Sequence, residues 1–256
     1  MTDQQWAALS SFRERFRSQC DHWLAEAEGG CNEWAKLAAE AAAKDGVPPY
    51  PVDTPVVYNY SLDGLTPESD IRLIVVGDNP GKNEQLAGNR RYLVGLAGKI
   101  GDRFFRLNPE LGIDFRRNVL ILNKTPLHSA KTKELDWIKE RASPRLQTLL
   151  LESQEWMARE TASLRASLDC PLWLVGYSEL KKGGIFCAYA EELGSSCRRH
   201  TTGTPHPEQS VPVYCFQHFS MNRFTIDLAQ RGDTTLPLAE NLTRLGTLHR
   251  REILGW

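Results

Sequence analysis

The fold is decided by the stretch Ile71-Arg72-Leu73-Ile74-Val75-Val76-Gly77-Asp78-Asn79-Pro80-Gly81. A run of β-branched and aliphatic residues with one early polar interruption is typical of a strand that is buried on both faces. The Gly, Asn and Pro residues that follow end the strand abruptly. The strand therefore delivers two polar side chains, Asp78 and Asn79, to its carboxyl end.

These two side chains admit a structural and a functional interpretation. Asp-Asn-Pro-Gly is good turn chemistry, because Pro presets φ and Gly accepts positive φ, so the motif alone favours a plain turn. In open α/β sheets, however, ligands bind in the crevice outside the carboxyl ends of the strands. A carboxylate beside an amide in that crevice can orient or deprotonate a water. The rest of the chain decides between the two interpretations.

The remaining segments predict an α/β fold. Further buried strands are expected at 119–122, 172–176 and 211–217, with a short edge strand at 56–60. Helices are expected at 3–28, 32–44, 94–107 and 144–164. This alternation implies a three-layer α/β/α sandwich with a central, mostly parallel four-stranded sheet, plus N-terminal helices. We expect a helical extension at 1–55, packed on an α/β domain at 56–256.

Length and composition exclude several classes of protein. A chain of 256 residues can bury a full core and fits one large α/β domain. No apolar run approaches the ~18 residues of a membrane span, and residues 1–5 lack the layout of a signal peptide, so a cytoplasmic protein without membrane contact is expected. The six cysteines contain no C-x-x-C pair and no zinc-like spacing, which predicts reduced thiols, no metal site and no disulfide framework.

The formal net charge of −1 hides an asymmetry along the chain. Residues 21–70 contain ten acidic and two basic residues and carry −8, whereas residues 1–20 carry +1. The remaining body therefore carries +6. A basic body beneath an acidic segment can hold a polyanion on one face, although composition alone favours ordinary solvated surface.

Polar residues follow three of the predicted strands directly. Asp78 and Asn79 end the first strand, Asn123 closes the strand at 119–122, and His218 follows the strand at 211–217. Because the carboxyl ends of parallel strands lie on the same side of a sheet, we expect these side chains to converge.

The order and wording of these segments resemble the uracil-DNA glycosylase superfamily. Residues 77–81 resemble its Gly-x-x-Pro-Gly motif, with Asn in third place as in the mismatch-specific and single-strand-selective branches and an acid in second place as in the iron-sulphur branch. Residues 93–98, Leu-Val-Gly-Leu-Ala-Gly, with Asp102 beyond, are similar to the Phe-Val-Gly-x-Ala-Gly segment of the iron-sulphur branch. Asn123 matches the uracil-reading Asn, and residues 211–220 are similar to the strand and His-Pro-Ser loop that closes the family's site.

The chain also departs from the family's pattern. The stacking Phe falls on Leu93, unless a one-residue insertion lets Tyr92 take its place, and the His-Pro-Ser loop reads His-Phe-Ser. A rival His206-Pro207 follows no buried strand, which favours His218. The cysteine ligands of the iron-sulphur branch are missing, so we expect no cluster and no other cofactor.

The resemblance covers about residues 71–230 and implies a monofunctional DNA glycosylase, which hydrolyses the N-glycosidic bond of a flipped uracil or a related deaminated base. It implies catalytic roles for Asp78, Asn79 and His218, and base binding by Gly77, Pro80, Tyr92, Leu93 and Asn123. It implies DNA contacts from Gly81, Lys124, Phe219, Ser220, Met221, Asn222 and Arg223, with Arg90 and Arg91 as further candidates. His128 stands where one branch has a covalent loop histidine, but that branch's basic insertion is absent.

Alternatives remain open for the whole chain and for single residues. The drift at Leu93 and Phe219 also fits a catalytically inactive member that binds nucleic acid or a protein partner. Asn123 also fits a strand cap, and Tyr92 fits ordinary loop packing. A small-molecule or nucleotide binder is disfavoured, because no G-x-G-x-x-G or Walker-type loop follows any strand. The expected partner is single-stranded or mismatched DNA, bound by a monomer.

Overall fold

Four parallel strands form the centre of the molecule, in the order β2-β1-β3-β4. The computed structural model describes residues 1–28, 32–201 and 212–256. The strands are β1 (Leu73–Gly77), β2 (Val119–Asn123), β3 (Leu172–Val175) and β4 (Val213–Phe216). In register, Gly77 pairs with Asn123 and Val175 with Phe216, so the strands end along a common edge. The expected parallel sheet is confirmed.

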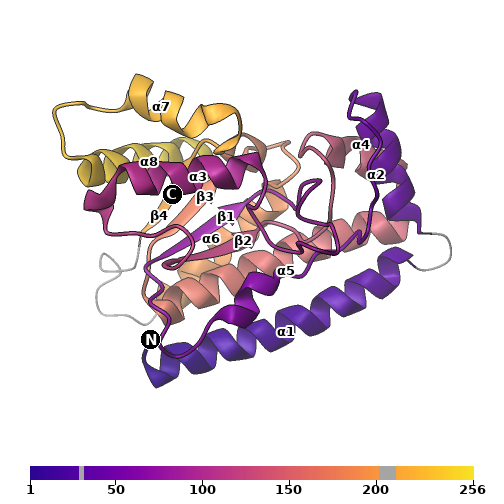
Figure 1. The fold of residues 1–256 in the computed structure, drawn as a ribbon, viewed down its shortest axis with the longest axis horizontal. Helices are drawn as coiled ribbons and strands as arrows, with labels where there is room; N and C mark the ends of the chain where they lie inside the picture. Colours follow the sequence, from indigo (N-terminus) through magenta and orange to yellow (C-terminus); the bar gives the residue numbers. More distant parts are fainter. Residues whose placement is uncertain (29–31, 202–211) are drawn as a thin grey trace.

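Helices cover both faces of this sheet (Figure 1). They are α1 (Asp3–Glu28), α2 (Glu33–Lys44), α3 (Leu96–Leu107), α4 (Glu134–Arg141), α5 (Pro144–Leu168), α6 (Cys187–Thr201), α7 (Arg223–Arg231) and α8 (Leu238–Leu254). Short 3-10 turns occur at Tyr60–Gly64, Pro109–Leu111, Tyr177–Leu180 and Ser220–Asn222. In Figure 1, α3, α7 and α8 lie together on one side, whereas α5 and α6 pack against each other on the other. The three-layer α/β/α architecture is therefore confirmed, N-terminal helices included.

The aromatic stripe of α1 attaches this helix to the core, as its helical spacing predicts. Phe12, Phe16 and Trp23 are buried. Their rings lie 6.2, 5.7 and 5.6 Å from that of Trp156 on α5. Burial of such a stripe supplies most of the stability of a surface helix, because isolated helices are marginal in water. The helix runs alongside α5 over most of its length (Figure 1).

A second aromatic cluster fills the space between the sheet and the α3–α7 layer. The indole of Trp173 on β3 lies 5.5 Å from the ring of Phe105 and 5.9 Å from that of Phe224. Phe219, directly after β4, is fully buried 5.0 Å from Phe224 and 6.0 Å from Phe115. This packing holds the loop that follows β4 against the end of the sheet.

The edge strand expected at 56–60 is not formed. Val56 makes one isolated antiparallel bridge with Leu127. The chain then turns, because the side chain of Asn59 accepts the N–H of Ser61 at 3.2 Å and starts a 3-10 turn at Tyr60. The extended segment is therefore too short to pair as a strand. No helix in the part of the chain that the structure describes is long and apolar enough to cross a membrane.

Candidate functional site

The common edge of the strands opens onto one cavity of about 550 Å³. Asp78 and Asn79 enter it from the end of β1, Asn123 from the end of β2, and His218 from the loop after β4. The structure thus brings together the four side chains that the sequence places after separate strands. The sheet register is the cause, because it aligns the strand ends side by side.

Asp78 is held in one orientation by two hydrogen bonds. Its Oδ1 accepts from Nζ of Lys124 at 2.5 Å, and its Oδ2 accepts from Oγ1 of Thr132 at 3.1 Å. Gly176, at φ +83°, passes so close that a Cβ there would lie 2.4 Å from Oδ1. A glycine at the end of β3 is therefore needed both for the backbone conformation and for space. The carboxylate is mostly buried but still reaches the cavity.

Lys124 does not reach the surface, which corrects its expected contact with a DNA phosphate. Its side chain is fully buried, and Nζ also donates to the carbonyl of Val175 at 2.7 Å and to that of Gly77 at 3.4 Å. These bonds and the ion pair with Asp78 use the three donors of the ammonium group. A buried ion pair with further hydrogen bonds is costly to break by removing one partner. Lys124 is therefore a support of the site rather than a DNA contact.

Asn79 is oriented by the loop that follows β2. Its Nδ2 donates to Oγ of Ser129 at 2.9 Å and, at 3.3 Å, to the Ser129 carbonyl. The amide oxygen Oδ1 is then the group that Asn79 can offer to a molecule in the cavity, and it is an acceptor. An acceptor in this position can hold a water.

Asn123 lines the cavity and carries an unsatisfied polar group. Its side chain is 1% exposed, and its Nδ2 has no hydrogen-bond partner in the part of the chain that the structure describes. Gly77 makes room for the amide, since a Cβ there would lie 2.6 Å from Oδ1 of Asn123. A buried donor without a partner costs about 1–3 kcal/mol. A ligand that accepts this hydrogen bond would recover that free energy.

His218 is fixed in one tautomer by its own loop. Its Nδ1 accepts the backbone N–H of Ser220 at 3.1 Å and lies 2.8 Å from Oγ of Ser220. The proton of the neutral ring is therefore on Nε2, the donor that the ring can offer to the cavity. Burial lowers the pKa of His218; the negative charge of Asp78 opposes this shift, and the positive charge of Lys124 adds to it.

Of the two residues considered for stacking on a base, only Leu93 lines the cavity. Leu93 takes the left-handed conformation at φ +52°, and its carbonyl accepts from the guanidinium of Arg116 at 2.9 Å. Tyr92 is 1% exposed and donates its hydroxyl to the carbonyl of Val57 at 2.6 Å. The expected base contact of Tyr92 is therefore corrected, because its ring faces the core. An aliphatic side chain takes the corresponding place in the wall.

Of the two apolar residues expected to contact DNA from the loop after β4, Phe219 and Met221, only Met221 lines the cavity. Phe219 is buried in the aromatic cluster, so its expected DNA contact is corrected. Met221 is 75% exposed, adopts φ +55° and lines the cavity together with Ser220. Asn222 and Arg223 are exposed but lie outside the cavity lining.

The remaining candidates differ in their position relative to the cavity. Gly81 lines the cavity. Gly77 and Pro80, expected to bind the base, do not line the cavity. The Pro80 carbonyl lies 2.8 Å from Nδ1 of His128. Arg90 and Arg91 do not line the cavity. His206 lies outside the described residues.

His128 supports the turn after β1 and does not enter the cavity. Its Nδ1 donates to the Pro80 carbonyl, and its Nε2 lies 2.9 Å from the hydroxyl of Tyr50. Trp34 of α2 donates to the His128 carbonyl at 2.8 Å. Burial lowers the pKa of His128 to about 4, so the ring is neutral. The N-terminal segment therefore braces the turn that carries Asn79.

Glu84 is a cavity residue that the sequence analysis did not single out. It is 7% exposed, and its Oε2 accepts the N–H of Gly81 at 3.2 Å. Burial raises its pKa to about 7, against the opposing effect of hydrogen bonds from the backbone of Gly81, Leu93 and Val94. The carboxylate thus joins two parts of the connection between β1 and α3. Only its position three residues after the Pro-Gly turn marked it, and a charged residue there is ordinary loop composition.

Lysines and hydroxyl residues from the loop after β2 were also missed. Ser129, Lys131, Thr132 and Lys133 line the cavity, as does Lys82 from the loop after β1. These residue types are common on any surface, so no sequence signal separates them from solvated loop residues.

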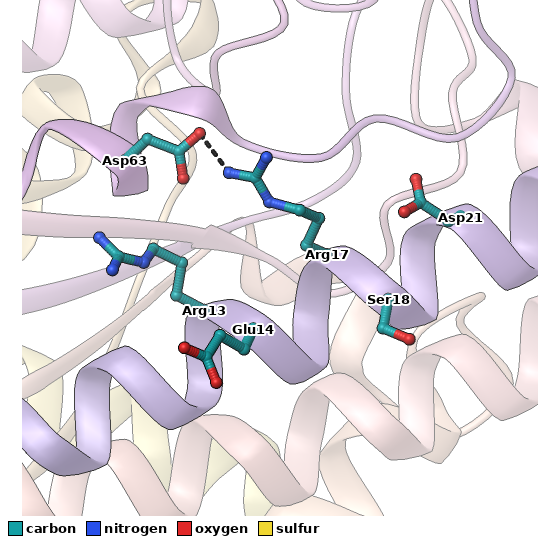
Figure 2. Close-up of a pocket in the computed structure, with 6 residues that line it drawn as sticks. All are labelled: Arg13, Glu14, Arg17, Ser18, Asp21 and Asp63. Atoms are coloured by element: carbon teal, nitrogen blue, oxygen red, sulfur yellow. Dashed lines mark hydrogen bonds and ion pairs between the residues drawn. The ribbon is translucent and has the colours of Figure 1, made fainter.

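A second depression lies along the outer face of α1 (Figure 2). It is lined by Arg13, Glu14, Arg17, Ser18, Asp21 and Asp63. Figure 2 shows that Arg17 and Asp63 face each other, and their closest charged atoms are 2.5 Å apart. Exposed pairs of this kind contribute little and offer no free charge to a ligand. We therefore take the cavity at the strand ends as the candidate site.

No cluster of three or more potential metal ligands occurs among residues 1–28, 32–201 and 212–256. The chain matches no protein-family model and no curated protein. The chemistry of the cavity is therefore the basis on which we infer a function.

Proposed function

We propose that this protein is a monofunctional DNA glycosylase that releases uracil or a related deaminated base from DNA by attack of water. The observation that carries the proposal is the buried Nδ2 of Asn123, which has no hydrogen-bond partner among the described residues, in a side chain that lines the cavity together with His218 and Asn79. A volume of about 550 Å³ is in the range of small-molecule sites and accommodates a nucleoside.

Asn123 would read the base. Its amide offers one acceptor and one donor, which match N3–H and O4 of uracil. The same edge of cytosine carries an acceptor and an amino donor, which the amide in this orientation does not match. Nδ2 of Asn123 is already removed from water in the free protein. A base that cannot accept a hydrogen bond from it would leave this donor unpaired, and the free-energy cost of the unpaired donor would favour uracil over such a base.

His218 would stabilise the departing base. Cleavage of the glycosidic bond leaves negative charge on the pyrimidine, chiefly at O2 and O4. The Nε2–H of a neutral imidazole can donate to the developing negative charge at O2. Its orientation is set beforehand by Ser220, so no reorganisation accompanies the reaction.

Asn79 and Asp78 would act on the sugar side. We assign the attacking water to Oδ1 of Asn79, which accepts no hydrogen bond from the described residues, whereas each oxygen of Asp78 already accepts one. The ionised Asp78 would stabilise the positive charge that develops on the sugar. The water oxygen bonds to C1′ as the C1′–N1 bond breaks. The water loses one proton, and the released base gains one. The products are the free base and an abasic site.

The base must leave the helical stack to reach this cavity. Met221 is an exposed apolar side chain at the cavity edge and can fill the space that the base vacates. The resemblance implies DNA contacts from both Phe219 and Met221, and of the two only Met221 is exposed.

An excision panel tests the proposal. Oligonucleotides carrying uracil, hypoxanthine, xanthine or mismatched thymine, single-stranded and duplex, are incubated with the protein, and free base is quantified. We expect release of uracil, and loss of release when Asn79 is replaced by Ala. Lys139→Ala on the exposed face of α4 is the control. Absence of product from every substrate, beside an active reference enzyme, would favour a binding protein without catalytic activity.

A further inference from the structure

The mouth of the cavity carries lysines that have no role in the proposed chemistry. Lys82, Lys131 and Lys133 line it. The side chains of Lys131 and Lys133 are 45% and 66% exposed, so their ammonium groups reach solvent at the cavity edge. The part of the chain that includes them is the basic body identified from the charge distribution.

The loop that carries Lys131 and Lys133 is anchored at its backbone. The N–H of Lys131 donates to Oε2 of Glu134 at 3.2 Å, and its carbonyl accepts from Oγ of Ser129 at 2.9 Å. The next residue, Thr132, donates to Asp78. The two lysines are thus held in a fixed relation to the cavity floor, as a preorganised binding group requires.

Both lysines contact one carboxylate of the N-terminal segment. Oδ2 of Asp45 lies 2.8 Å from Nζ of Lys133 and 3.5 Å from Nζ of Lys131. Nζ of Lys131 also donates to the Asp45 carbonyl at 3.1 Å. Asp45 directly follows α2. This helix packs on α4, next to the loop that carries Lys131 and Lys133 (Figure 1). The acidic segment therefore places a single negative charge on two positive charges at the mouth of the site.

We propose that Lys131 and Lys133 bind a backbone phosphate of the DNA strand beside the flipped nucleotide, and that Asp45 competes with this phosphate. This inference rests on the proposed function, since it names the contact that would hold the substrate strand at the same cavity. A carboxylate and a phosphate both present oxygen acceptors with negative charge, so one pair of ammonium groups can serve either. Asp45 offsets only one of the two ammonium charges, and the side chains of Lys131 and Lys133 remain accessible to a strand.

Asp45 is ionised at neutral pH, as any aspartate with an ordinary pKa of about 4 would be. Its hydrogen bond and charge interaction with Lys133, assisted by Lys131, lower the pKa of the Asp45 carboxyl further. Lys82, whose ammonium lies 5.8 Å from the ring centre of Tyr50, has no such acidic partner among the described residues.

Binding of a short fluorescein-labelled oligothymidine, followed by anisotropy between about 50 and 200 mM salt, tests the inference. The double substitution Lys131→Gln and Lys133→Gln should weaken binding and reduce the slope of log K against log salt by about 0.7, the value for one lost phosphate contact on a single strand. Asp45→Asn should strengthen binding about threefold at low salt, the size of one charge interaction across about 6 Å of water. In the background without the two lysines, Asp45→Asn should have no effect.

Two matched variants control for net charge. Lys139→Gln on α4 removes a positive charge outside the cavity, and Glu14→Gln on α1 removes a negative charge in the depression of Figure 2. Both should bind DNA like the unchanged protein. Thermal melts establish that every variant is folded.

The inference is overturned if the double lysine variant keeps the full salt slope, or if Asp45→Asn binds no more tightly than Glu14→Gln. Uracil excision by the same proteins separates this result from the proposed function. If the lysine variant excises uracil and binds DNA as the unchanged protein does, the glycosylase proposal is supported and the phosphate site is contradicted. If DNA binding follows the prediction but no protein excises uracil, the phosphate site is supported and the glycosylase proposal is contradicted.

Discussion

Nζ of Lys124 lies 2.5 Å from Oδ1 of Asp78 at the floor of the cavity, and the lysine side chain is fully buried. The two residues end neighbouring parallel strands, and the ammonium group also holds the carbonyl that ends β3. One buried lysine thus ties three strand ends together and keeps a negative charge at the site.

This relationship predicts an asymmetric response to substitution. Lys124→Met should lower the free energy of unfolding by about 3–5 kcal/mol, because it leaves the Asp78 carboxylate buried without its partner. The double variant Lys124→Met with Asp78→Asn should be more stable than Lys124→Met alone. Urea denaturation measures both. Equal stability of the single and double variants would show that the ion pair does not govern this part of the fold.

The unpartnered amide of Asn123 predicts opposite effects on stability and on activity. Asn123→Leu removes a buried donor that has no partner and should raise the free energy of unfolding by about 1 kcal/mol. The same substitution should abolish release of uracil, because the group that reads the base is lost. Thermal or urea unfolding and the excision assay are carried out on the same preparation. A variant that retains uracil release would remove Asn123 from the recognition of the base.

The tautomer of His218 predicts the acid limb of the pH profile. Burial lowers the pKa of His218, so the ring stays neutral down to a pH below the ordinary histidine value of about 6.5. Single-turnover excision should be independent of His218 ionisation at neutral pH, and should decline only where the ring gains its second proton and Nδ1 can no longer accept from Ser220. His218→Gln should remove this decline together with most of the activity. A decline centred at or above pH 6.5 would contradict the assignment.

Glu84 predicts a pH-dependent cost to stability. Its pKa is about 7 in the folded protein and about 4.5 ordinarily, so the folded state disfavours the carboxylate. Stability should therefore fall as pH rises from about 4.5 through 7, by about 3 kcal/mol in total. Glu84→Gln should remove this fall, and it should gain on the unchanged protein at pH 8 but not at pH 4.5. The difference between the two proteins is compared at each pH, because His128 titrates in both.

Much of the fold followed from local pattern. The apolar run that ends at Gly77 and the helical spacing of Phe12 and Phe16 are short-range signals, and they predicted β1 and α1 where they occur. The prediction of an edge strand at 56–60 was wrong. Its β-branched residues are typical of a strand, but the hydrogen bond from the N–H of Ser61 to the side chain of Asn59 forms a turn, which hydrophobic periodicity does not detect.

The cavity was predictable only in part. Asp78, Asn79, Asn123 and His218 could be grouped from sequence, because parallel strands end on one edge. The direction of the side chains of Tyr92, Phe219 and Lys124 could not be predicted from sequence. Residues far along the chain decide whether a side chain next to a motif points to the core or to the cavity.

The sequence by itself determined the four strands, the helices α1, α2, α3 and α5, and which polar residues end the strands, because these depend on residues close together in the chain. Only the tertiary structure decided that Lys124 pairs with Asp78, that the amide nitrogen of Asn123 lacks a partner among the described residues, and that Asp45 lies on Lys131 and Lys133. Such relationships join residues tens of positions apart. They depend on packing, which brings distant groups within a few ångströms and removes the water that would otherwise satisfy them.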